Sequence, residues 1–423
     1  MGARGPPFPK RSSSVSIRSA TAALGLAAAL LCPRPGGAAP SRITLQDAFA
    51  LARQHAPALV EARARVKAAQ GPVASAAPLL RENPQLDFQV GPRRLPNGDS
   101  GLDLAVGLAQ PFELGGKQGL RREAARAGLS MEDARLRDAE RLVMGDVAAA
   151  YLRLLEAREH LKLVSAAAEA TARTVQATER RYAAGDVPAV DVNVAKVAHA
   201  RARAEVQVAQ GELSALRAEL EGRLGYRAGS LSTYEDDLRG LARAAPRTSP
   251  EGVGARADVV ALEQEQARAK AAATLGRRQV LPDVALGVRY QKEADETVFL
   301  GTLSVPLPLF ARGQEARLVG EADASRAEGE LRAARIVVPA QVQAATDRYL
   351  ASRDALGALE EILPLLDDNE ALAQRSYDAG EMDLAAFLLI RRDTLEARAA
   401  WLDGLLRVAL ARVQLEVETG VLP

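Results

Sequence analysis

The residues that could do chemistry are few and scattered. The chain has three histidines, whose spacing fits no metal-binding motif: His55, His160 and His199. Cys32 is the only cysteine, which excludes an internal disulfide and a cysteine-based metal site. Gly115-Gly116-Lys117 resembles the end of a phosphate-binding loop, but Pro111 stands where that motif needs its first glycine. The sequence therefore predicts no catalytic residue, no metal ion and no cofactor.

The charged residues favour a structural role over nucleic-acid binding. The 423 residues include 55 basic and 54 acidic side chains, for a net charge of +1. This balance argues against a nucleic-acid partner, which is attracted by excess positive charge. Carboxylates alternate with arginines along stretches rich in Ala, Leu and Glu, as they do on the solvated faces of long helices.

The first 39 residues have the pattern of a signal peptide. Four basic residues precede an apolar run from Ala20 to Leu31, and Gly37-Ala38-Ala39 provides small residues for cleavage. This run is shorter than the roughly 20 residues of a membrane-spanning helix. Cys32 could be a lipoprotein cysteine, but the bulky Leu31 before it favours its removal with the signal peptide. We therefore expect an exported protein.

The rest of the chain contains one unit twice. Arg181-Tyr182-Ala183-Ala184-Gly185-Asp186 recurs as Ser376-Tyr377-Asp378-Ala379-Gly380-Glu381, at an offset of 195 residues. The same offset relates Leu155 to Leu350, Leu220 to Leu415 and Gly225 to Gly420, among others. This agreement without gaps predicts a duplication with repeats at 42–225 and 255–420, joined by a linker or surface segment at 226–254.

Each repeat is expected to combine a shorter helix with a long helical hairpin. Thr44 can cap a helix that runs to about Gln70, and Ala257 begins the corresponding helix of the second repeat. Leu136, Val143, Val147, Leu154 and Leu161 form a heptad-like seam on a helix from about 118 to 181. A return helix follows at about 190–224, and the second repeat shows the same pattern.

Between these helices the hydrophobic period changes to two. Four segments alternate in this way, and we expect them to form two β-hairpins: 85–90, 102–110, 283–290 and 299–305. Each approaches the ~10 residues that a tilted strand needs to cross a bilayer. Alternation alone also fits a small soluble sheet. Four strands cannot close a barrel and open edges are not tolerated in lipid, so membrane-spanning strands would require several chains.

This order of elements resembles the TolC-like outer membrane efflux proteins, or outer membrane factors. The resemblance rests on the signal peptide, the duplication, the two strand pairs and the Tyr-x-x-Gly turns, and it covers nearly all of 42–420. It implies an α+β membrane protein: a homotrimer whose twelve-stranded transmembrane β-barrel, with four strands per chain, continues into a long periplasmic α-helical barrel. The implied function is that of a passive exit duct in a tripartite efflux or type I secretion system of a Gram-negative bacterium.

The same resemblance implies partners and site residues. The family docks onto a periplasmic adaptor (membrane fusion protein), which connects it to an inner-membrane pump of RND or ABC type. Adaptor contact is thereby expected at the periplasmic turns, at Gly185, Val187, Gly380 and Met382. Tyr377 and Asp191 match positions of a polar latch at the tunnel mouth. Outer membrane lipid would surround the strands.

One alternative from a different functional class stays open at this point. A periplasmic coiled-coil scaffold or adaptor would use the same helices, with the strands as a soluble sheet. It predicts polar residues on both faces of the strands, and the Leu, Val and Phe faces argue against it.

Overall fold

The computed structural model describes residues 43–94, 98, 100–231, 234–247, 256–293, 296–310 and 312–421. The predicted signal peptide and Cys32 lie outside the described residues, as does part of the 226–254 segment. The predicted repeat boundaries at 42–225 and 255–420 stay a prediction.

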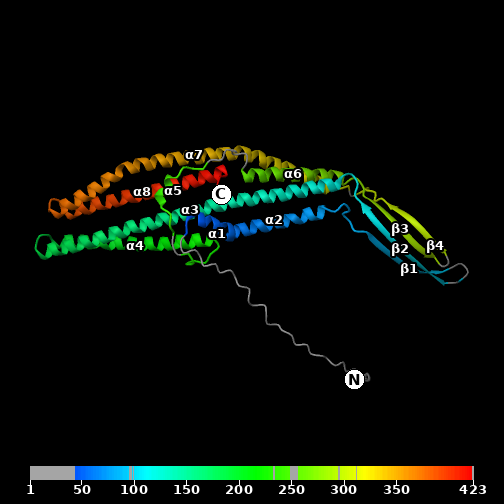
Figure 1. Ribbon diagram of the computed structural model, residues 1–423, viewed down its shortest axis with the longest axis horizontal. Helices are drawn as coiled ribbons and strands as arrows, with labels where there is room; N and C mark the ends of the chain where they lie inside the picture. Colours follow the sequence, from blue (N-terminus) through cyan, green and yellow to red (C-terminus); the bar gives the residue numbers. More distant parts are fainter. Residues whose placement is uncertain are drawn as a thin grey trace, which may run out of the picture. The chain divides into compact units, whose positions relative to one another are not determined.

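The first half of the described chain contains four helices and two strands, which Figure 1 shows in blue to green. Their bounds are α1 Leu45–His55, α2 Pro57–Ala76, β1 Gln85–Arg94, β2 Ser100–Phe112, α3 Lys117–Ala183 and α4 Ala189–Arg223. The Thr44 cap is confirmed: its hydroxyl accepts from the amide of Asp47, and the Asp47 carboxylate accepts from the amide of Thr44.

The single helix expected from Thr44 to Gln70 is wrong in one respect. The helix is interrupted at Ala56, whose backbone is not helical (φ −57°, ψ 125°), and α2 begins at Pro57. Proline has no amide hydrogen and disfavours a helical residue before it, so a new helix starts there. Pro72 lies inside α2, which continues to Ala76.

The second half repeats this order after a short helix. Its elements are α5 Leu238–Arg243, α6 Ala257–Arg278, β3 Val284–Glu293, β4 Glu296–Ser304, α7 Gln314–Asp378 and α8 Leu384–Thr419. Gly225 and Gly420, at the predicted offset, both adopt positive φ at the ends of α4 and α8. The described part of the 226–254 segment packs on α8, where the Arg239 guanidinium lies 4.7 Å from the Trp401 ring centroid.

The four strands form one antiparallel sheet in the order β1-β2-β3-β4. The register aligns Phe88, Val106, Tyr290 and Phe299 in one row across the sheet, and Leu86, Leu108 and Val288 in the next row. The alternating pattern therefore places most of the large apolar side chains on one face, whereas Val298 and Leu300 of β4 lie on the other. Because the apolar face packs on nothing within the described residues, Phe88 is 64% and Phe299 75% exposed.

Helix α3 is the element on which the other helices assemble. It has 67 residues, which corresponds to a length of about 100 Å. It packs against α1, α2, α4, α6 and α8. The predicted heptad seam is therefore only part of its buried surface, and Met144, Tyr151 and Leu155 are also fully buried. Helix α6 in turn approaches α7 closely, since an added Cβ at Gly276 would lie 2.5 Å from the carbonyl oxygen of Ala316.

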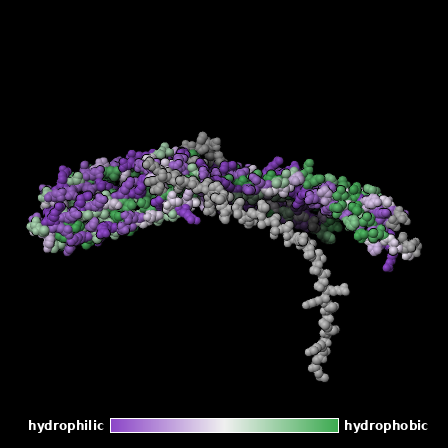
Figure 2. Space-filling view, turned by 60° about the horizontal axis from the view of Figure 1, so that its bottom comes forward, coloured by the Kyte–Doolittle hydropathy of each residue, from purple (hydrophilic) through white to green (hydrophobic). Residues whose placement is uncertain are grey.

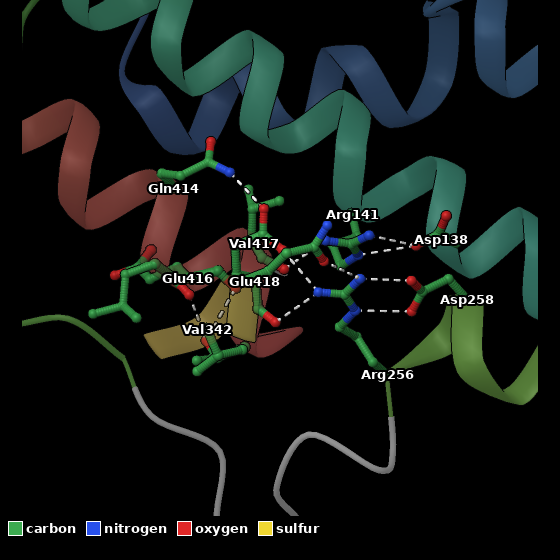
Figure 3. Close-up of polar contacts among 12 residues, drawn as sticks. Asp138, Arg141, Arg256, Asp258, Val342, Gln414, Glu416, Val417 and Glu418 are labelled. Carbon is green, nitrogen blue, oxygen red and sulfur yellow. Dashed lines mark hydrogen bonds and ion pairs between the residues drawn. The ribbon is translucent and has the colours of Figure 1, made fainter. Parts of the chain in front are cut away.

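A buried ionic network joins α6, α8 and α3 near the C-terminal end of α8 (Figure 3). The Arg256 guanidinium donates to both carboxylate oxygens of Asp258, at 2.8 and 2.6 Å, and to Glu418 at 2.8 Å. On α3, Arg141 pairs with Asp138 and donates to the carbonyl of Val417 at 2.6 Å. The hydrogen bond that Arg256 donates to Asp258 raises the pKa of Arg256. Burial opposes ionisation of Asp258, but Arg256 outweighs it and lowers the pKa of Asp258.

Candidate functional site

The two helical hairpins turn with the same backbone geometry. After α3, Gly185 has a φ of +86°, and the amide of Asp186 donates to the carbonyl of Arg181 at 2.9 Å. After α7, Gly380 has a φ of +76°, and the amide of Glu381 donates to the carbonyl of Ser376 at 2.9 Å. Both are glycine caps of the kind that ends many helices, in which a left-handed residue lets the chain reverse.

The predicted contact residues lie at these turns and expose part of their surface. Gly185 and Gly380 are exposed, while Val187 and Met382 are half-buried. Met382 packs against a small core formed by Ala195, Ala373, Tyr377, Leu384 and Phe387. Asp383 caps α8, since its side chain accepts from the amide of Ala386 at 2.7 Å. The turns therefore present a hydrogen-bonded backbone with a few apolar side chains.

The predicted latch residues lie at the same end of the hairpins. Asp191 is in the first turn of α4 and Tyr377 in the last turn of α7. Within the described residues, no hydrogen bond joins them: the Tyr377 hydroxyl lies 3.2 Å from Oγ1 of Thr178, and Asp191 makes no side-chain hydrogen bond or ion pair. The Tyr377 hydroxyl is thus engaged with α3, and among the described residues the Asp191 carboxylate has no hydrogen-bond or ion-pair partner.

Sequence reasoning missed an aromatic stack at this end of the hairpins. The rings of Tyr377 and Phe387 are parallel, with centroids 4.6 Å apart. The Arg181 guanidinium lies 5.4 Å from the Tyr377 centroid, and that of Arg391 lies 5.0 Å from the Phe387 centroid. Burial lowers the pKa of Arg391. Two cations thus enclose two rings and connect the ends of α3, α7 and α8, an arrangement that cation–π attraction favours.

On the face of the sheet opposite the apolar one, charged side chains of different strands form ion pairs with one another. Arg93 on β1 contacts Asp103 on β2 at 3.1 Å and Glu293 on β3 at 2.5 Å. Arg289 on β3 reaches over β2 to Asp87 on β1 at 3.0 Å. Gly107 stands between them, and a Cβ there would lie 2.4 Å from the Asp87 carboxylate. The sheet therefore has one apolar face and one face lined by paired charges.

The described residues contain no cluster of His, Cys, Asp and Glu that could hold a metal ion. The histidines are apart: His55 packs edge-on against Tyr226, His199 lies 3.2 Å from the Thr171 hydroxyl, and His160 is half-buried on α3. None of the helices in the described ranges has an apolar stretch long enough to cross a bilayer.

Comparison with known protein families shows to which family this chain belongs. The outer membrane efflux protein family matches residues 49–226 and 253–421. The chain belongs to this family. It is the outer membrane channel of a tripartite efflux system, and it lies in the outer membrane of a Gram-negative bacterium and extends into the periplasm. The family assignment supports this function and not the periplasmic scaffold or adaptor considered from the sequence.

Individual relatives agree with this assignment. The chain is 27% identical over 367 residues to the cobalt-zinc-cadmium resistance protein CzcC of Cupriavidus metallidurans, with 86% of each chain covered. Among solved structures, the outer membrane protein VceC from Vibrio cholerae aligns with a TM-score of 0.74 at 20% identity, covering 89% of this chain and 96% of that one. CusC aligns with a TM-score of 0.75 at 18% identity, covering 88% and 91%. These two structures show that the efflux channel shares their fold.

The aromatic stack generates a testable prediction for the channel. Replacing Phe387 by Ala removes a fully buried ring, and such truncations cost about 3–5 kcal/mol. We expect the last turns of α7 and the first turns of α8 to exchange their amide hydrogens faster. Hydrogen exchange followed by mass spectrometry measures this. Leu389→Ala is the matched control, since Leu389 is on the same helix and exposed; equal exchange in both variants would contradict a fastening role for the stack.

Proposed function

We propose that this efflux channel is a homotrimer whose three sheets close a twelve-stranded barrel in the outer membrane. The observation that carries the proposal is the four-stranded sheet, which has an exposed apolar face and unpaired edges at β1 and β4 within the described residues. Peptide groups at an open edge cannot be left unpaired in hydrocarbon. Three copies joined edge to edge remove every edge, and the apolar face then contacts lipid.

The polar face fits the inside of such a barrel. Its two arginines, Arg93 and Arg289, contact three carboxylates, so the wall would carry fixed charges of both signs toward water. Transmembrane barrels have this alternation, with apolar residues outward and polar residues inward. The long helices α3, α4, α7 and α8 would form the periplasmic part of the conduit.

The barrel is tested by two adjacent substitutions on β1. Phe88→Arg puts a charge on the apolar face, where it costs about 2–4 kcal/mol per chain at the middle of a bilayer. Gln89→Arg puts the same charge on the polar face. We expect Phe88→Arg to reduce the amount of trimer in outer-membrane fractions, and Gln89→Arg to leave it unchanged. The measurement is membrane fractionation followed by mass determination of the detergent-extracted complex; a soluble monomer in the unsubstituted protein would overturn the proposal.

We further propose that the hairpin turns dock the periplasmic adaptor, through Gly185, Val187, Gly380 and Met382. Support comes from their position, since these residues lie at the turns and leave exposed backbone next to half-buried apolar side chains. An adaptor would link the channel to an inner-membrane pump.

In this proposal Asp191 and Tyr377 form the latch that narrows the tunnel mouth, with the unpartnered Asp191 carboxylate facing a neighbouring chain. Asp191→Asn should then raise conductance in planar bilayers, and an unchanged conductance would contradict the latch.

The docking proposal predicts the effect of a charge at Met382. Met382→Asp should weaken binding of the periplasmic adaptor by about tenfold or more, since charge is unfavourable in the centre of an interface. Surface plasmon resonance with the purified trimer measures the affinity. Val208→Asp is the control, because Val208 is exposed on α4 away from the turn. Equal affinity for both variants would place the adaptor elsewhere.

For the cargo we propose divalent metal cations. Two relatives support this choice: CzcC is named for cobalt, zinc and cadmium resistance, and NccC of Alcaligenes xylosoxydans, 27% identical over 301 residues, for nickel, cobalt and cadmium resistance. The gene should restore growth of a deletion strain of its host on zinc, cobalt or cadmium salts. Growth on organic antibiotics is measured in parallel. Restored antibiotic tolerance without restored metal tolerance would refute the metal assignment.

A further inference from the structure

The charged side chains of the strands are concentrated on the polar face of the sheet. Figure 2 shows hydrophobic residues gathered over the strands. All the charged residues of the strands except Arg94 and Lys292 share the polar face: Asp87, Arg93, Asp103, Arg289, Glu293 and Glu296. Carboxylates outnumber arginines among them, so the polar face of each chain carries net negative charge.

Arg289 lies along the surface of the sheet and does not stand upright on it. The register puts Asp87 of β1, Gly107 of β2 and Arg289 of β3 in one row. Neighbouring strands are about 4.8 Å apart, so the backbones of Asp87 and Arg289 are roughly 10 Å apart. Arg289 nevertheless donates to the Asp87 carboxylate at 3.0 Å, which requires its side chain to cross β2. Its Nε is covered from solvent, as expected for a side chain lying against the wall.

Arg93 crosses β2 in the same way, nearer the hairpin ends of the strands. From β1 it contacts Asp103 on β2 at 3.1 Å and Glu293 on β3 at 2.5 Å. The Arg93 side chain is 38% exposed and that of Arg289 32%, although both lie on an open face of the sheet. The two arginines therefore form part of the wall and leave the space above it free.

Small residues on β2 leave room for this arrangement. A Cβ at Gly107 would lie 2.4 Å from Oδ2 of Asp87, so only a glycine fits beneath the contact with Arg289. Ala105, two residues away on the same face, is 6% exposed, although the sheet packs extensively only on its own strands. Its cover therefore comes from longer side chains of β1 and β3. A larger residue at Gly107 would displace the Asp87 carboxylate and leave Arg289 without its partner.

An arginine released from these contacts would extend into the lumen of the proposed barrel. The symmetry of a trimer would place three such arginines at one level. Rings of charged side chains set which ions pass a water-filled channel, and positive charge lowers the local concentration of cations. The width and the charge of the lumen at this level thus depend on the carboxylates that hold the arginines against the wall.

We propose that Asp87, Asp103 and Glu293 are positioning residues that hold Arg93 and Arg289 flat on the inner wall of the barrel and thereby keep its lumen permeable to divalent cations. The inference rests on the proposed barrel and the proposed metal cargo, and it names the residues that let this cargo pass the barrel. Gly107 belongs to the same arrangement, because the absence of a side chain there lets Asp87 and Arg289 meet over β2.

Two glycine substitutions that change no charge test the proposal in the purified full channel. Gly107→Val fills the space over β2 between Asp87 and Arg289, and valine is well accepted in strands. Gly91→Val is the matched control, because Gly91 lies on the same polar face and a Cβ there meets no atom within 4 Å. Single-channel conductance and reversal potential are measured in planar lipid bilayers under a gradient of zinc chloride.

We expect Gly107→Val to lower the ratio of zinc to chloride permeability at least about twofold and to reduce the conductance, because the freed Arg289 adds positive charge to the lumen. Gly91→Val should leave both quantities unchanged. Adding Arg289→Gln to Gly107→Val should restore the zinc permeability, because the projecting charge is then gone.

Three results would overturn the proposal and leave the barrel intact. They are an unchanged ratio in Gly107→Val, equal losses in the two glycine variants, and a loss that Arg289→Gln does not restore. An unsubstituted channel that conducts no ions would instead contradict the proposed barrel itself.

A second pair of variants gives the same comparison if Gly107→Val does not assemble. Asp87→Asn and Glu296→Gln each remove one carboxylate from the polar face, but Glu296 makes no hydrogen bond or ion pair among the described residues. Asp87→Asn should therefore lower the zinc-to-chloride permeability ratio at least about twofold more than Glu296→Gln does, since it alone frees an arginine. Equal losses would show that only the net charge counts, and the positioning role would fall.

Discussion

Peptide groups in a hydrocarbon layer must be paired within the protein, and β1 and β4 each present a row of them that has no partner within the described residues. The other features of the chain are consistent with an assembly of several chains in which these peptide groups are paired. Most of the large apolar side chains lie on one face of the sheet, and the charged side chains that form ion pairs lie on the other. A single chain leaves the peptide groups of its edge strands unpaired, and this is why we propose the trimer as the functional form.

Much of the fold could be predicted because its signals are local or periodic. The offset of 195 residues identified two equivalent turns, and both Gly185 and Gly380 have the left-handed conformation that such turns require. Alternation along the strands gave the correct faces, since side chains in a strand point to opposite sides in turn. The break at Ala56 could have been predicted as well, because Pro57 follows it directly; the helical period on both sides concealed it.

Contacts between distant residues could not be predicted in the same way. Tyr377 and Phe387 are ten positions apart on opposite sides of a turn, and Thr178 and Arg181 come from a helix almost 200 residues earlier. The first hairpin has no such stack, since Tyr182 is 51% exposed where its counterpart Tyr377 is buried. The two duplicated turns therefore differ in the burial of their tyrosines. This difference depends on the packing of α3 on α8, which the repeated sequence does not show. The Arg256 network was likewise invisible, because its members come from three helices.

The prolines of α7 have a mechanical consequence. Helix α3 has no proline in its 67 residues, whereas α7 carries Pro339 and Pro364 and follows a curved course in Figure 1. Each proline removes one amide donor, so the carbonyls of Arg335 and Glu360 lose their usual helical partner and the bending stiffness falls there. The two longest helices, α3 and α7, therefore differ in bending stiffness. We expect bending of the helical hairpins to concentrate at Pro339 and Pro364, since the matching positions of the first repeat carry no proline.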